Sequence, residues 1–301
     1  MLAPSPARDQ RLGIGAGLLA AILWGMANVL TKRTLGHFEP LPLLLLQLTG
    51  SNAVLWPMLL LSRTAPIRRG ELRTLGWPGL IQPGLAFVLG TLGLALTTAS
   101  NDALIWASES VMVIGLAGLL FGRRPAPRLV LLAAAALAGV ALATSNPTGT
   151  GTPVSFAGNA LILAAVACGA LYTLVTEPQL RRRHPLALLA LHQLWGLGCA
   201  MVVWLARVAF TGRNDFPPEL SAHWLVAFGS GTLQFALPFL LFLVALDRLG
   251  ASRVSSFLTV PPVVTIIGAR IFLGERLAGV QLLGGLVVLV AVVAIQRMAP
   301  E

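Results

Sequence analysis

An acidic side chain in the middle of an apolar segment is the sharpest chemical feature of this 301-residue sequence. Glu109 lies about eight residues into the apolar run from Asn101 to Phe121, so a helix would carry it roughly 12 Å deep at 1.5 Å per residue. An acid at the centre of a membrane helix costs on the order of 2.5–3.5 kcal/mol, so it normally faces the protein interior or a water-filled cavity. We interpret Glu109 as a group that binds a substrate amine or exchanges a proton. The alternative is an acid satisfied by neighbouring Ser and Gln side chains.

Two further residues share the helical face of Glu109. Asp102 and Trp106 precede it by seven and three residues. Asp102 is close to the end of the run, and we expect it to lie in interfacial water. Trp106 either forms a wall of a cavity or packs against lipid.

Five polar side chains interrupt other apolar runs. They are Gln47, Gln82, His192, Gln193 and Gln234. Polar contacts between membrane helices contribute only about 0.6 kcal/mol on average, so stability alone is a weak reason to keep all five. Each is a candidate substrate contact, and the alternative for each is a hydrogen bond that holds two helices together. His192 is also a candidate proton carrier, because imidazole titrates near neutral pH. Its neighbour Gln193 faces another direction, so at most one of the two points squarely into a cavity.

Aromatic and proline residues complete the candidate site. The predicted cavity walls are Trp24, Asn28, Phe87, Tyr172, Trp195 and Phe235. Proline removes a backbone hydrogen bond from a helix. The predicted hinges, which could equally be static kinks, are Pro83, Pro238, Pro261 and Pro262.

Long apolar runs indicate the elements that position these residues. The chain is 56% apolar and 11% charged, whereas soluble domains have about 25% charged residues. A helix needs roughly 20 apolar residues to cross a bilayer. Runs without a charged residue are Leu12 to Thr31, Pro40 to Ser62, Thr74 to Asn101, Leu129 to Thr176, Pro185 to Ala206, Leu220 to Leu246 and Leu277 to Gln296.

These runs predict ten membrane helices. The run from Leu129 to Thr176 holds two helices, separated by a turn signal from Ser145 to Gly151. Two more helices, from Asn101 to Phe121 and from Ser252 to Leu273, each include isolated charged residues. Continuous apolar runs exclude the alternating strands of a membrane barrel, so the predicted fold class is an all-α integral membrane protein.

An internal repeat divides the chain into two predicted units, 1–150 and 151–301. The segment LLLLQLTG from Leu43 resembles LALHQLWG from Leu189, and the match includes Gln47 with Gln193. Five helices in each unit make the two units inverted with respect to each other. Inverted repeats are typical of secondary transporters, whose substrate site lies between the halves near the midplane.

The net charge of +10 is assigned to loops that flank the membrane rather than to nucleic-acid binding. If the N-terminus is inside, most of the 21 Lys and Arg residues fall on the cytoplasmic side. The six on the other side are Lys32, Arg33, Arg207, Arg213, Arg270 and Arg276. We therefore predict a multi-pass protein of the inner (plasma) membrane with both termini in the cytoplasm.

The sequence has no pattern that indicates an enzyme, a metal site or a cofactor site. HExxH, GxSxG and Walker A motifs are absent, as is any Cys/His cluster with metal-ligand spacing. Cys168 and Cys199 are interpreted as small packing residues without a disulfide. The expected partners are a small-molecule substrate and the lipid bilayer, with the chain as a monomer or homodimer.

Several segments together resemble the drug/metabolite transporter superfamily in its ten-helix EamA-type branch. They are WGMAN from Trp24, SESVM from Ser108, VPPVV from Val260, FLGER from Phe272 and LLGG from Leu282. The chain departs from this pattern at Gln47, where many members have Arg, and at Arg123, where the acid of Leu-Gly-Glu is lost; Ser110 also replaces the usual Pro.

The resemblance implies a secondary transporter, more specifically an exporter, that works by alternating access. Its substrates would be small metabolites such as amino acids, including aromatic ones, as in exporters of the YddG type. It also implies that helices three, four, eight and nine line a central cavity, with one and six beside them and five and ten at the periphery. The alternative is a membrane-embedded enzyme or receptor that uses the same cavity.

Overall fold

A computed structural model describes residues 6–62, 64, 67–120, 127–144, 155–217 and 222–298. Within these ranges every regular element is helical. Six segments are long and apolar enough to cross a membrane, and four more are apolar but shorter: Leu80–Ala95, Val130–Leu142, Phe257–Leu273 and Gly279–Ala294. The expected all-helical membrane architecture is confirmed. The predicted turn from Ser145 to Gly151 and Arg123 lie outside the described residues.

The elements of the first half are α1 (Pro6–Thr34), α2 (Pro40–Leu61), α3 (Arg69–Thr74), η1 (Leu80–Leu85), α4 (Ala86–Ala95), α5 (Ala99–Trp106), α6 (Glu109–Leu120) and α7 (Pro127–Thr144). Those of the second half are α8 (Phe156–Leu180), α9 (Pro185–Thr211), α10 (Ala222–Gly231), η2 (Thr232–Ala236), α11 (Leu237–Leu249), α12 (Ala251–Val254), η3 (Ser255–Thr259), α13 (Val260–Gly268), η4 (Ala269–Leu273) and α14 (Gly279–Met298).

Each of the four predicted prolines lies where a helix changes its geometry. Gln82, which precedes Pro83, leaves the helical region with φ −147° and ψ 127°, inside the wide turn η1. Pro238 is in the first turn of α11, directly after the wide turn η2. Pro261 and Pro262 begin α13 after the 3-10 turn η3. A proline in the first turn of a helix removes no helical hydrogen bond, so Pro238, Pro261 and Pro262 fit at the starts of α11 and α13.

The runs predicted for the third and fourth helices are more broken than expected. The apolar run from Thr74 to Asn101 is interrupted at η1, where Pro83 indicated a hinge or kink, and its helix α4 ends at Ala95. The fourth helix begins with α5 at Ala99, two residues before the predicted start, and is interrupted between α5 and α6. Uniform hydrophobicity concealed this second break.

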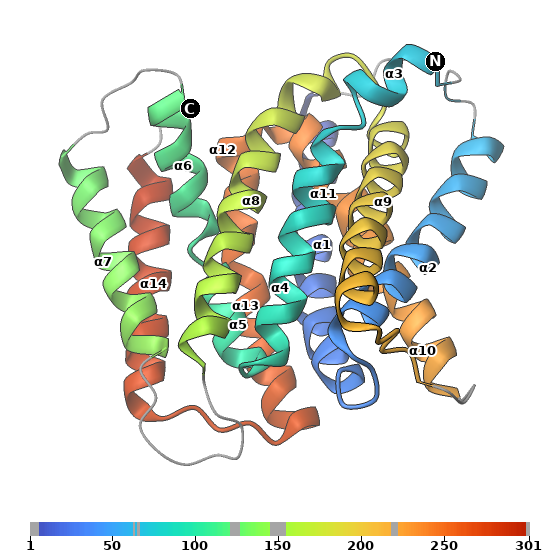
Figure 1. The fold of residues 1–301 in the computed structure, drawn as a ribbon. Coiled ribbons are helices and arrows are strands. Elements are labelled where there is room, and N and C mark those ends of the chain that lie inside the picture. Colours follow the sequence, from blue (N-terminus) through green and yellow to red (C-terminus); the bar gives the residue numbers. More distant parts are fainter. Residues whose placement is uncertain are drawn as a thin grey trace.

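The first helices of the two halves run in opposite directions. At the end of α1, Lys32 Nζ donates to the carbonyl oxygens of Leu94 and Thr97, which follow α4 or end it. Just before α8, the Ser155 amide donates to the carbonyl of Leu96 in the same turn. Helix α1 therefore ends at the end of the bundle where α8 begins (Figure 1).

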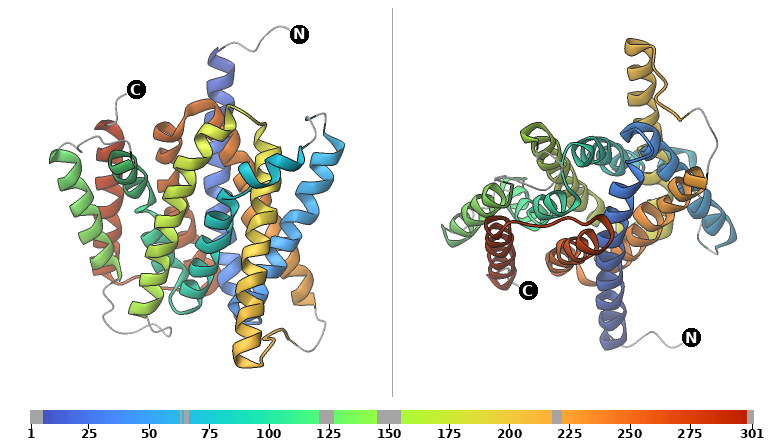
Figure 2. Two further views of the ribbon diagram at one scale, coloured as in Figure 1. Left: turned by 45° about the horizontal axis from the view of Figure 1, so that its top comes forward. Right: turned by 90° about the horizontal axis from the view of Figure 1, so that it is seen from below.

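The first two long helices of each half pack against elements of the other half. Helix α1 packs on α11 and α13, and α8 packs on α4 and α6. Helix α2 packs on α10 in the same way that α9 packs on η1. Helices α7 and α14 pack on each other at one edge of the bundle (Figure 1, Figure 2).

Glycines allow the closest of these paired contacts. A Cβ on Gly231 would overlap the carbonyl oxygen of Gln47, and a Cβ on Gly79 would overlap that of His192. Each glycine precedes a cavity-side glutamine by three residues, Gln234 and Gln82 respectively. A close helix contact at a glycine therefore lies near the cavity-side glutamine in each half.

The outer surface of the bundle carries large apolar side chains. Among the most exposed are Leu60, Leu61, Phe210 and Leu225. Extensive exposed apolar surface marks contact with lipid or another protein, and here it covers helices of membrane-spanning length. Both cysteines are free, as expected.

Candidate functional site

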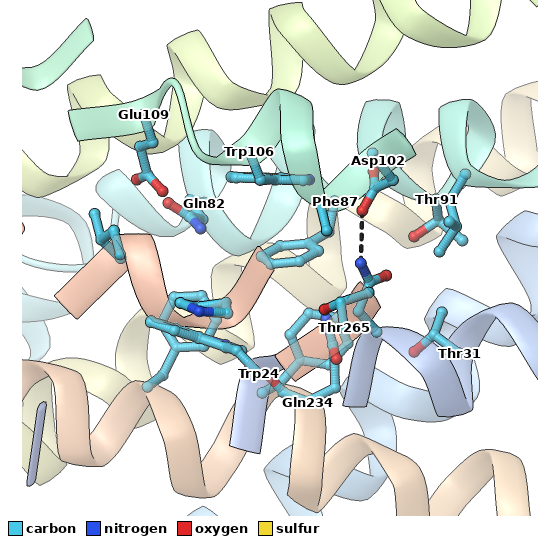
Figure 3. A pocket seen from close by; sticks show the side chains of 18 of the residues that line it. Trp24, Thr31, Gln82, Phe87, Thr91, Asp102, Trp106, Glu109, Gln234 and Thr265 are labelled. Atoms are coloured by element: carbon cyan, nitrogen blue, oxygen red, sulfur yellow. Dashed lines mark hydrogen bonds between the residues drawn. The ribbon is translucent and has the colours of Figure 1, made fainter. Parts of the chain in front are cut away.

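A cavity of about 100 Å³ lies between the two halves (Figure 3). The structure brings ten of the predicted substrate-contact residues to its wall: Trp24, Asn28, Gln47, Gln82, Phe87, Trp106, Glu109, Tyr172, Gln234 and Phe235. Of the predicted hinge residues, Pro261 and Pro262 also line it. Neither α7 nor α14 contributes a described lining residue, in keeping with their place at one edge.

Glu109 reaches the cavity from the first position of α6. The chain leaves α5 after Trp106, and Ser108 Oγ donates to the carbonyl of Ile105 at 2.7 Å, which closes the turn. Only 7% of Glu109 is exposed. The break between the helices turns the carboxyl group toward Gln82 (Figure 3).

Two oxygen atoms converge beside Gly169 of α8. A Cβ on Gly169 would lie 2.9 Å from Glu109 Oε1 and 3.3 Å from Gln82 Oε1. Within the described part of the chain, no side chain or amide donates a hydrogen bond to the Glu109 carboxyl group. The absence of a Cβ at Gly169 thus lets these two acceptor oxygens approach the backbone of α8 closely.

Asp102 corrects a prediction, because it lies in the cavity wall and not in interfacial water. It is buried, and its Oδ2 accepts a hydrogen bond from Asn28 Nδ2 at 2.8 Å (Figure 3). Packing of α5 against α8 and α13 covers this turn. Position near the end of an apolar run therefore did not indicate exposure.

Glu275, which follows η4, caps the N-terminus of α5. Its carboxylate accepts hydrogen bonds from the amides of Ala99 and Ser100, both at 2.9 Å, and from Ser100 Oγ at 2.6 Å. A carboxylate at a helix N-terminus satisfies free amides and the helix dipole. The sequence showed Glu275 only as part of the Leu-Gly-Glu resemblance, and nothing in its spacing pointed to α5.

Aromatic rings form most of the cavity wall. Phe87 stacks with Trp106 at a centroid distance of 5.9 Å and meets Phe235 edge-on at 4.7 Å. Trp24 Nε1 donates to the Gln234 carbonyl in the wide turn η2 at 3.1 Å, and its ring contacts Phe239 at 5.0 Å. Trp106 therefore packs in the cavity and not against lipid. Phe239 and Phe242 also line the cavity and were missed, since the sequence offers many phenylalanines of similar spacing.

His192 and Gln193 lie outside the cavity, although both were candidate substrate contacts and one of the two was allowed to point into it. The His192 ring is fully buried and bonded on both nitrogens, to Tyr172 Oη at 3.0 Å and to the Leu75 carbonyl at 2.9 Å. Gln193 Nε2 donates to the carbonyl of Phe235 at 3.2 Å. Periodicity alone could not show that both residues hold helices together.

Two other predicted residues have structural partners. The side-chain amide of Gln47 lines the cavity, but its Nε2 donates to Thr31 Oγ1 and Ser230 Oγ, each at 3.0 Å. Trp195 is absent from the cavity wall, and its Nε1 donates to the Leu72 carbonyl at 2.7 Å. Where the chain is described, His, Cys, Asp and Glu side chains form no group of three that could hold a metal ion.

Comparisons with known proteins agree with this arrangement. Residues 11–145 and 156–297 each match the sequence profile of the EamA-like transporter family. A solved structure titled only as the crystal structure of a protein is similar with a TM-score of 0.64 and 16% identity, over 96% of this chain and 98% of that chain. No curated protein sequence matches the chain.

Proposed function

The chain belongs to the EamA-like transporter family, and from that premise we propose that it is a secondary exporter of small metabolites such as amino acids, including aromatic ones. Family membership makes the protein a membrane transporter of small molecules. The more specific proposal has ten membrane helices in two inverted units, 1–150 and 151–301, in the inner membrane with both termini in the cytoplasm. The chain acts as a monomer or homodimer.

The buried carboxyl group of Glu109 carries this proposal. It lies between the halves, in a wall to which both profile-matched regions contribute side chains. Membrane proteins keep an acid at such depth mainly for binding or proton exchange. A substrate ammonium beside Glu109 would supply the hydrogen-bond donor that the described protein groups do not.

Alternating access is supported by the position of the helix breaks. Turns η1, η2 and η3 adjoin the cavity-facing helices α4, α11 and α13. Residues that end and restart helices are suited to absorb the backbone changes of a hinge. In this proposal the two halves rock about the cavity and the proline-containing turns bend. Glu109 binds substrate and exchanges a proton between the two states.

Transport into proteoliposomes tests this proposal. Purified protein is reconstituted and uptake of labelled amino acids is measured with and without a pH gradient. We expect flux above that of empty vesicles, and acceleration by the gradient if a proton is exchanged. No flux for any amino acid would contradict the amino-acid proposal, and binding without flux would favour a receptor.

A further inference from the structure

We infer that the cavity selects organic amines that carry no free carboxylate, such as arylalkylamines, over the corresponding amino acids. The inference rests on the proposed export of small metabolites and on the ammonium contact at Glu109, and it names amines without a carboxylate as the substrate class in place of amino acids. A zwitterionic amino acid needs a positive partner for its carboxylate as well as a negative partner for its ammonium group. The cavity wall offers only the second.

The charges in the wall are all of one sign. The described lining residues include two acids, Asp102 and Glu109, and none of them is Lys, Arg or His. Lys32 is the cation nearest along α1, but its ammonium group donates to the carbonyls of Leu94 and Thr97 instead. Asp102 is held by Asn28. Glu109 is thus the acid left to pair with a ligand.

Acceptor oxygens are available in the cavity wall. Glu109 Oε1 and Gln82 Oε1 lie together against Gly169, and elsewhere in the wall the buried Gln234 Oε1 has no hydrogen-bond partner within the described structure. An ammonium group has three N–H donors and no acceptor, so it matches these oxygens. A carboxylate placed there would face further acceptors and a negative charge, which is unfavourable out of water.

The aromatic wall suits the same chemistry. Phe87 and Trp106 stack close to Glu109, and Trp106 lies within reach of the Gly169 position, 3.2 Å from its hypothetical Cβ. Aromatic faces attract organic cations and also accept an apolar body. An amine with an aromatic or alkyl body would therefore place its charge at Glu109 and its body against these rings.

Equilibrium binding to the purified protein in detergent tests the inference separately from transport. The probes are radiolabelled phenethylamine and phenylalanine, which differ only by the carboxylate, with phenylalanine methyl ester as a competitor whose carboxylate is masked. We expect phenethylamine to bind at least about 10-fold more tightly than phenylalanine, and the ester to compete like the amine. A single charge-assisted contact is sufficient for this difference.

Two variants locate the effect. Glu109→Gln should weaken phenethylamine binding at least about 10-fold, whereas Glu39→Gln, an exposed acid outside this cavity, should leave it unchanged. Gln82→Lys keeps Glu109 but adds a cation beside it. It should weaken amine binding and reduce the preference over phenylalanine even if Glu109→Gln fails to fold.

The outcomes separate the inference from the proposed function. Equal or tighter binding of phenylalanine overturns the inference, even if phenylalanine is transported. Failure of folded wild-type protein to bind either probe also overturns it. A retained amine preference without amino-acid flux supports the inference and contradicts amino-acid export alone.

Discussion

Glu109 and His192 are both titratable side chains inside apolar helices, but the protein surrounds them in opposite ways. His192 has a partner on each ring nitrogen, Tyr172 Oη and the Leu75 carbonyl, and lies outside the cavity. Glu109 lines the cavity, and the described residues give it no donor. One group is part of the interior, and the other is exposed to whatever enters the cavity.

This contrast shows that depth in a membrane does not by itself identify a functional residue. Both sites are at least nine-tenths buried, so burial does not separate them. The two sites differ in whether the buried side chain has hydrogen-bond partners. A buried polar group normally has partners, and an unpaired one requires an explanation. A ligand is the simplest explanation where the unpaired group faces a cavity.

The largest expected effect is loss of transport in Glu109→Gln. The substitution keeps the size of the side chain and removes its charge, so the protein should fold with little change in stability. A hydrogen bond to a charged group contributes about 1.5–3 kcal/mol, which corresponds to a loss of about 10- to 150-fold in flux at subsaturating substrate. Flux into proteoliposomes and elution of a monodisperse peak measure the two properties.

The same variant can also break the comparison. If Glu109→Gln transports normally but unfolds at lower temperature, Glu109 is a structural acid like His192.

His192→Leu should show the reverse pattern. It removes the partner of Tyr172 Oη and of the Leu75 carbonyl, both buried. Leaving such groups unpaired costs about 1–3 kcal/mol each, so we expect a loss on the order of 2 kcal/mol in the free energy of unfolding. Flux per folded molecule should be unchanged.

Thermal unfolding in detergent measures this loss, and the control is His37→Leu, at an exposed histidine whose ring stacks on His223, which should lose less stability than His192→Leu. If His192→Leu is stable but loses its response to a pH gradient, His192 carries protons after all. The comparison between the two sites would then fail.

Glu275 sharpens the comparison, because it is an acid near the cavity with all its bonds made inside the protein. Glu275→Ala removes the cap from Ala99 and Ser100 and should lower the free energy of unfolding by about 1–2 kcal/mol. Glu275→Gln keeps one acceptor and should lose less. Affinity for the transported substrate should stay within about twofold of wild type. A selective loss of affinity would show that Glu275 acts in the cavity.

The fold was accessible from the sequence to the extent that hydrophobicity determines it. Charge-free runs predicted helices of the right order, and the match of Gln47 with Gln193 predicted related halves. Both halves form paired helix contacts in these segments, where Gly231 packs on Gln47 and Gly79 packs on His192, the residue before Gln193. The breaks within runs were not visible, except where proline indicated them.

The candidate site was accessible only as a set of residue types. Ten of the lining residues could be predicted as substrate contacts, because polar and aromatic residues are rare in apolar runs. The sequence could not place Asp102 in the wall, or His192 and Gln193 outside it, because the direction in which a side chain points depends on how the helices pack. It could not pair Glu275 with α5, because that contact joins residues 175 and 176 positions apart.

The smallest expected effect concerns an acid outside the segments long and apolar enough to cross a membrane. Glu71 of α3 pairs with Arg183, which follows α8, and both side chains are partly exposed. The hydrogen bonds from Arg183, and then that from the Arg68 amide, hold the pKa of Glu71 below its ordinary value of 4.5. The pair therefore stabilises the folded state above about pH 4.5, and this contribution is lost as the pH falls through the lowered pKa.

Glu71→Gln should thus lower the melting temperature slightly at pH 7, and the difference from wild type should shrink in acid and at high salt. Melting curves from pH 7 to pH 3 in both proteins measure this. A difference that persists unchanged in acid would mean that Glu71 acts by packing and not by charge. If the loss exceeded that of His192→Leu, burial would be a poor guide to which polar groups stabilise this protein.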